Sequence, residues 1–115
     1  DVVSVGYDRY NALSSVQKWE AAGLTCVEVK QHSSVLHPAT KLLSEKIEGG
    51  KWHYRPNRML EINFQNARCT YDTNLNRYVN KKKSNGKVDM VAALLNAVCL
   101  LQQDVIFGDD FIVQY

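Results

Sequence analysis

Two acidic side chains stand at positions where a carboxylate could do chemistry. Asp8 directly follows Val2–Tyr7, a short β-branched run that predicts a buried strand. Open α/β sheets place their ligands at the carboxyl ends of strands, so Asp8 is a candidate for binding or catalysis. Asp89 lies in the first turn of a strongly predicted helix. Each also has a plainer interpretation. Asp8 could simply form a turn, and Asp89 could simply interact with the helix dipole, which stabilises the helix by about 0.3–1 kcal/mol.

A basic cluster lies directly before Asp89. It consists of five cations: Arg77, Lys81, Lys82, Lys83 and Lys87. Lysines neutralise phosphates and carboxylates hold Mg²⁺ or Mn²⁺ against a scissile phosphate, so the combination is typical of a site for a polyanion beside a cation. Ala92 and Ala93 follow one turn later and would let this helix approach the sheet closely, bringing Asp89 near Asp8. The competing interpretation is a solvated basic loop.

The elements that must position these residues predict an α/β fold. Val2–Tyr7, a helix from Asn11 or Ser14 through Ala22, and a strand over Leu24–Lys30 form a βαβ unit, so the two strands should be parallel. The patterns further along predict a polar loop over His32–His37, a helix from Pro38 to Gly49-Gly50, a helix from Asn57 to about Asn66, a hairpin of Arg68–Tyr71 with Arg77–Asn80, and a helix from Lys87 to about Gln103.

Length and composition exclude several classes of protein. A chain of 115 residues predicts one domain over residues 1–115, and 45% hydrophobic with 23% charged residues is an ordinary globular composition. The net charge of +2 is too small to argue for nucleic acid by itself. No apolar run reaches the ~20 residues of a membrane span, no phosphate-binding glycine loop encodes an ATPase, and three widely spaced cysteines indicate buried, reduced thiols. Because the chain opens on a strand-like run, we expect it to be a piece of a longer protein.

Several short motifs, in order, resemble the nuclease domain of tailed-phage terminase large subunits. The matching segments are Tyr7–Ala12, Val27–Gln31, Leu36–Lys41, Ile47–His53, Asn66, Lys81–Ser84 and Lys87–Leu94. Arg9 is a minor departure, since the family often has proline there. The resemblance implies an RNase H-like three-layer α/β fold, with a partial parallel sheet, flanking helices and a β-hairpin. It also implies that the ATPase motor and the first strands of the sheet lie upstream of this chain, which would be the C-terminal portion of the nuclease domain.

The resemblance further implies a metal-dependent endonuclease that cuts concatemeric double-stranded DNA during packaging into the capsid. Asp8 would be the second acidic ligand and Asp89 the third in a site for two Mg²⁺ or Mn²⁺ ions, with the first ligand upstream. Water would attack a phosphodiester in line. The residues that bind DNA phosphates would be Lys81, Lys82, Lys83, Lys87 and Arg77. Of these, Lys83 and Lys87 would be the main candidates, and Lys81 and Lys82 would widen the DNA track. The implied partners are duplex DNA, the terminase small subunit and the portal, in the cytoplasm of a bacterial host.

Other functions remain open from the residues alone. The chain could be a non-catalytic module that docks its basic cluster on DNA, the portal or another packaging subunit, with Asp89 only starting a helix. It could be another RNase H-like enzyme, such as a resolvase or transposase, with the same acidic geometry. Metal dependence separates the first alternative from the nuclease, and a preference for junctions or transposon ends over linear duplex separates the second. The plainest alternative is an α/β domain whose charges are solvated.

Overall fold

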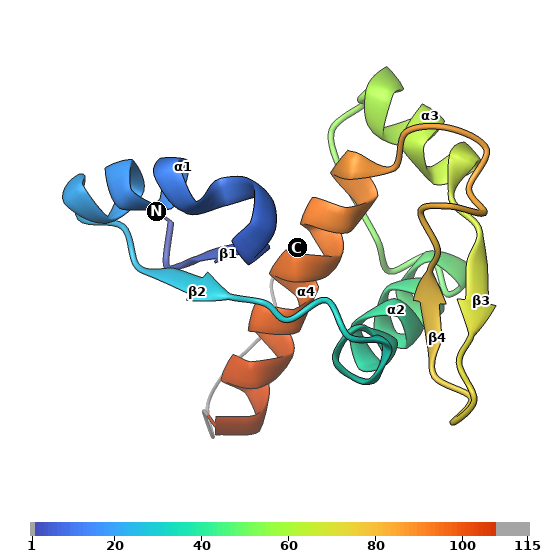
Figure 1. The fold of residues 1–115 in the computed structure, drawn as a ribbon. Coiled ribbons are helices and arrows are strands. Elements are labelled where there is room, and N and C mark those ends of the chain that lie inside the picture. Colours follow the sequence, from blue (N-terminus) through green and yellow to red (C-terminus); the bar gives the residue numbers. More distant parts are fainter. Residues whose placement is uncertain (1, 108–115) are drawn as a thin grey trace.

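The computed structural model describes residues 2–107 and has an α/β fold (Figure 1). In chain order its elements are β1 (Val5–Tyr7), α1 (Arg9–Ala21), β2 (Cys26–Glu28), α2 (Ser33–Glu48), α3 (Arg58–Asn66), β3 (Cys69–Tyr71), β4 (Arg77–Val79) and α4 (Asp89–Phe107). β1 and β2 form a parallel pair, and β3 and β4 form an antiparallel hairpin. In Figure 1, α4 crosses the middle of the molecule, with the β1–α1–β2 unit on one side and α2, α3 and the hairpin on the other.

The first three elements confirm the predicted parallel βαβ unit. Val5 lies opposite Cys26 in the ladder, and Gly23, at φ 92°, provides the left-handed turn between α1 and β2. Both strands are shorter than predicted. Val2 and Val3 are 65% and 79% exposed, because the turn before β2 leaves no residue of that strand to pair with them.

α1 begins earlier than predicted. The expected starts were Asn11 or Ser14, but the helix begins at Arg9, immediately after Asp8. No glycine or proline separates these positions, so helical hydrogen bonding extends back to the end of the strand. Asp8 therefore lies at the junction of β1 and α1.

The predicted polar loop over residues 32–37 is wrong, because α2 begins at Ser33 and contains Pro38. Val35 and Leu36 pack against the hydrophobic core. Proline removes only one hydrogen bond from the helix, and the burial of these two side chains outweighs that loss. The sequence pattern missed this, since the core that these residues contact is formed mainly by α4.

The second half of the chain follows the predicted order. Asn57 caps α3, with Oδ1 accepting a backbone N–H of the first turn at 3.1 Å. The hairpin forms as predicted, and Asp72 Oδ1 accepts the N–H groups of Asn74 and Asn76 in its turn. α4 begins at Asp89, two residues after its predicted start.

The core lies where α4 packs against α2 and β1. Val91, Leu95 and Val98 follow one another at helical spacing on one face of α4, and all three are buried. The other buried members of the core are Val29, Ala39, Leu43, Cys99 and Leu100. α4 is therefore the element to which both halves of the described chain attach.

The three cysteines match the predicted burial only in part. Cys99 is buried as predicted and Cys26 is half-buried, but Cys69 is exposed because β3 has a single neighbouring strand and its outer face is uncovered.

Within residues 2–107, none of the helices combines the length and the apolar character needed to cross a membrane.

Candidate functional site

Asp8 lies half-buried at the carboxyl edge of the parallel pair. The register pairs Tyr7 with Glu28, so Asp8 and Glu28 leave the sheet at the same edge. Both line a cavity of about 310 Å³. Its other lining residues are Arg9, Val29, Lys30, Gln31 and His32. Glu28 was not among the predicted site residues, because the predicted strand ran on to Lys30 and placed Glu28 in its interior, whereas β2 ends at Glu28.

A hydrogen bond joins this strand edge to α4. Gln31 Nε2 donates to Val29 O at 2.9 Å and to Asn96 Oδ1 at 3.0 Å. Asn96 is buried, and Gly6 packs directly on it: a Cβ at Gly6 would lie 3.3 Å from Asn96 O. The glycine therefore permits β1 to approach α4 closely. The sheet and the helix are held together within two residues of Asp8.

Asp89 is the exposed first residue of α4, and neighbouring side chains hold this end of the helix. Asn63 of α3 is 6% exposed, and its Oδ1 accepts a backbone N–H of the first turn of α4 at 3.1 Å. Asn66 Nδ2 donates to Lys87 O at 3.0 Å. Asp89 precedes Asn96 by seven residues, which corresponds to about 10 Å along a helix axis. The carboxylate thus stands at the end of the helix whose middle packs on β1.

The donor chemistry of the two predicted ligands fits a hard divalent cation, since Asp8 and Asp89 both supply carboxylate oxygens. The geometry supplies only part of a metal site. Asp89 does not line the cavity that holds Asp8 and Glu28. Among residues 2–107, no group of three or more His, Cys, Asp or Glu side chains is placed to hold a metal ion. A site built on these carboxylates needs further ligand oxygens.

The four predicted lysines belong to one turn with a fixed backbone, residues 80–87, which we call the basic turn. Asn80 Oδ1 accepts the N–H groups of Lys82 and Lys83 at 3.0 and 3.2 Å. Gly86 packs on Asn66, where a Cβ would lie 2.8 Å from Asn66 Nδ2. The exposed side chains are those of Lys81, Lys82, Lys83 and Lys87. No acidic side chain pairs with them in the part of the chain that the structure describes, so their charge is available to an outside anion.

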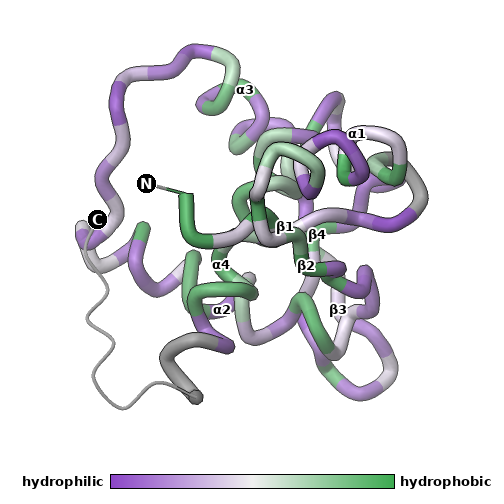
Figure 2. Tube along the Cα trace, turned by 90° about the vertical axis from the view of Figure 1, so that its left-hand side faces the viewer, coloured by the Kyte–Doolittle hydropathy of each residue, from purple (hydrophilic) through white to green (hydrophobic). Residues whose placement is uncertain are grey.

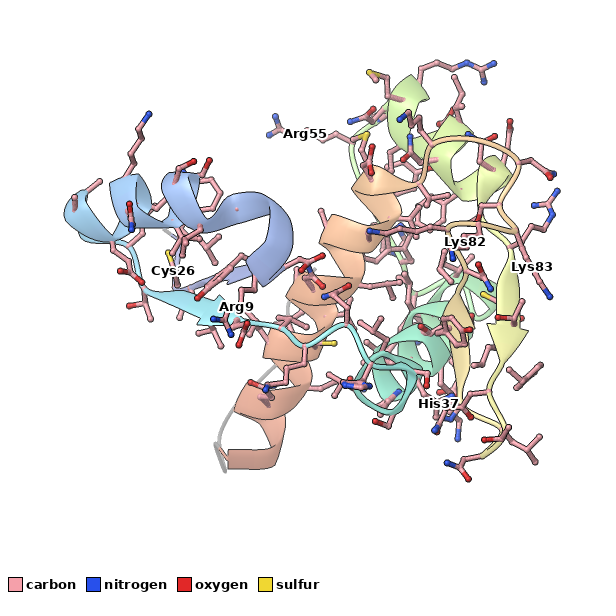
Figure 3. The ribbon with its side chains drawn as sticks, viewed as in Figure 1. Arg9, Cys26, His37, Arg55, Lys82 and Lys83 are labelled. Atoms are coloured by element: carbon pink, nitrogen blue, oxygen red, sulfur yellow. The ribbon has the colours of Figure 1, made fainter. Side chains whose placement is uncertain are left out.

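Arg77 differs from the lysines because it is half-buried in a hairpin that is fastened to α2 at two points. Its backbone N–H donates to His37 Nδ1 at 2.7 Å. At the other point, Ser33 Oγ donates to Asp72 Oδ2. This bond, followed by those from Asn76, lowers the pKa of Asp72 to about 2. Figure 3 shows Lys82 and Lys83 beside the hairpin, on the side of α4 away from β1 and β2.

The chain is similar to one family of known proteins. The family model for the terminase large subunit, endonuclease domain, matches residues 1–104. The crystal structure of the HK97 bacteriophage large terminase matches with a TM-score of 0.76 and 25% sequence identity, over 87% of this chain. This chain spans 21% of the length of that protein. No curated protein matches the chain. The structural match confirms the predicted RNase H-like α/β fold class.

Proposed function

Because this chain belongs to the terminase large subunit family, within its endonuclease domain, we propose that it is part of a metal-dependent endonuclease that cuts concatemeric double-stranded DNA during genome packaging. The observation that carries the proposal is the connection between two carboxylates. Asp8 lies at the edge of the parallel strands, and the Gln31–Asn96 hydrogen bond ties that edge to the helix that begins with Asp89. Since the chain spans about a fifth of the HK97 large terminase, the activity of a whole terminase is part of the proposal.

Asp8 and Asp89 would hold Mg²⁺ or Mn²⁺ together with an acidic residue from an upstream strand of the parent protein. When bound, two such ions would lower the pKa of the attacking water and stabilise the leaving oxygen. The protein's contribution is to fix the carboxylates. Asp8 follows a strand packed on α4, and the cap from Asn63 holds the helix turn that carries Asp89.

The basic turn would hold the substrate beside Asp89. Lys83 and Lys87 would contact the nearest phosphates, and Lys81 and Lys82 would extend the contact along the duplex. Arg77 would add charge from the hairpin. Because lysines read phosphates and not base edges, binding should depend strongly on salt and weakly on sequence.

The proposed setting is the packaging machine of a phage or prophage in a bacterial cytoplasm. The complete protein would bind duplex DNA, the terminase small subunit and the portal. These partners come from the family to which the chain belongs and not from a surface of the described residues.

The test is Mn²⁺-dependent nicking of supercoiled plasmid by a large subunit that carries this chain. Asp8→Asn and Asp89→Asn should each reduce nicking by at least about 100-fold, because each removes a charged metal ligand. Glu45→Gln, which neutralises an exposed carboxylate on α2, is the matched control and should nick at the unchanged rate. Unchanged nicking by a folded Asp89→Asn protein would contradict the proposal. The 115-residue chain alone should not nick, since it holds only two of the proposed ligands.

A second function is favoured by the basic turn, whose four exposed lysines have no acidic partner among the described residues. The chain would then be a non-catalytic module that binds DNA through the basic turn. The response to metal separates the two functions. A large subunit that carries the non-catalytic module would bind duplex DNA in EDTA, but it would not nick the DNA with any divalent metal added. Nicking that is lost in Asp89→Asn would exclude the module.

A further inference from the structure

A second basic segment lies outside the site described above. It connects α2 to α3 over residues 51–58, and we call it the basic strap. Its cations are Lys51, Arg55 and Arg58, with His53 between them, and no acidic residue occurs between Glu48 and Glu61. Figure 2 shows the connection that leads into α3 as a hydrophilic path.

The basic strap is anchored at both ends although its residues 51–57 belong to no helix or strand, and Arg58 is the first residue of α3. Lys51 N donates to Lys46 O at 2.8 Å, and Trp52 packs against the core. The ring of Tyr54 lies 6.1 Å from that of Trp52, tilted by 34°. At the other end, Asn57 caps α3. These contacts fix the path of the strap, so a ligand that binds it pays little ordering entropy.

Between the anchors, the strap presents its side chains to solvent. Tyr54 is 43% exposed, and Arg55 is exposed beside it. Arg58 lies 4.0 Å from Glu61, in a surface ion pair of little strength. Within the described residues, Lys51 and Arg55 have no acidic partner, and the N–H groups of residues 53–55 make no backbone hydrogen bond. Cationic side chains and unpaired N–H groups on one short segment are donors for an anion.

We propose that the basic strap binds the phosphate backbone of duplex DNA, as a second contact surface in addition to the basic turn. In Figure 3, Arg55 lies on one side of the N-terminal turns of α4, and Lys82 and Lys83 lie on the other. A duplex that contacts both surfaces would cross the end of α4 at which Asp89 stands. Tyr54 adds a hydroxyl group beside these cations, and tyrosine is among the side chains that donate hydrogen bonds to DNA phosphates.

The identity of the ligand as DNA rests on the proposed function, but the contact is measured without cleavage. Fluorescence anisotropy gives the Kd of the 115-residue chain for a labelled duplex of about 20 base pairs, in EDTA, over a series of salt concentrations. The strap variant is Lys51→Gln with Arg55→Gln. The matched control is Lys18→Gln with Lys41→Gln, two exposed lysines on α1 and α2. Both variants lose two positive charges.

The association constant falls as salt rises, and each lost phosphate contact makes the slope of its logarithm against log salt less negative by about 0.9. The strap variant should therefore have a slope less negative by about 1.8 and should bind about 10-fold or more weakly at about 0.1 M salt. The control should leave the slope within about 0.5 of the unchanged chain. Equal effects in the two variants would overturn the proposal, because net charge alone would explain them. An unchanged slope in the strap variant, or no binding by the unchanged chain, would overturn it as well. The binding result does not depend on whether the large subunit nicks DNA, because binding is measured in EDTA, where no divalent metal is free.

Discussion

The two hydrogen bonds of Gln31 make the connection between the strand edge and α4 measurable. Nε2 donates to Val29 O at 2.9 Å and to Asn96 Oδ1 at 3.0 Å, and Asn96 is 7% exposed. A neutral hydrogen bond contributes a net ~0.5–1.5 kcal/mol to stability. Because Asn96 is buried, water cannot replace the bond that its Oδ1 accepts from Gln31 when Gln31 is removed. When Asn96 is removed, Gln31 still donates to Val29 O. We therefore expect a coupling free energy of about 1 kcal/mol between Gln31 and Asn96.

The assay is urea unfolding of the unchanged chain, Gln31→Ala, Asn96→Ala and the double variant. Gln31→Ala alone should lower the free energy of unfolding by about 1–3 kcal/mol, since it leaves the buried Asn96 Oδ1 without its hydrogen-bond donor. The control cycle pairs Gln31→Ala with Asn57→Ala, which shares no hydrogen-bond partner with it, and should be additive. A coupling below about 0.3 kcal/mol in the main cycle would refute the reasoning, because the two side chains would then act independently.

Two further predictions concern stability. Because hydrogen bonding in the folded state lowers the pKa of Asp72 from 3.8 to about 2, its contribution to stability is present above pH 4 and is lost as pH falls towards 2. Unfolding free energies measured from pH 5 to pH 2 should show this loss, and it should be smaller in Ser33→Ala; identical pH profiles would contradict it. Gly6→Ala places a Cβ 3.1 Å from Leu100 Cδ1 and 3.3 Å from both Asn96 O and Val29 Cγ2. Overpacking costs about 1–3 kcal/mol and the stiffer unfolded chain offsets about 0.4–1, so urea unfolding should show a net loss near 1 kcal/mol, and a gain would contradict this packing.

Local patterns were sufficient for the βαβ unit, the hairpin and α4. Gly23 ends α1, Asn57 caps α3, and Asp72 holds the hairpin turn through bonds to neighbours within four residues. Such features depend on the identity of a few consecutive residues, which is why the sequence reveals them. The start of α2 at Ser33 cannot be predicted from consecutive residues, because it depends on the burial of the first turn of α2 against α4, which is distant in the sequence.

Local patterns likewise predict some features of the candidate site and miss others. The place of Asp8 after a strand and of Asp89 at a helix start follows from local patterns. The partnership of Gln31 with Asn96, 65 residues apart, does not, and neither does the pairing of Glu28 with the end of β1. Both depend on register and helix packing, which are set by long-range contacts. Asn63 illustrates the same limit, since its role as the cap of another helix is visible only once α3 lies beside α4.

The central claim is that Asp8 and Asp89 belong to one metal site of the large subunit. Fe²⁺ binds oxygen and nitrogen ligands in the same sites as Mn²⁺ with somewhat higher affinity, and with ascorbate and peroxide it cuts the polypeptide close to where it is bound. We predict cuts near both residue 8 and residue 89 in a large subunit that carries this chain, suppressed by excess Mg²⁺. Asp8→Asn should abolish both sets of cuts, whereas Glu45→Gln should abolish neither. Cuts near only one of the two residues, or cuts near residue 89 that survive Asp8→Asn, would contradict a shared site.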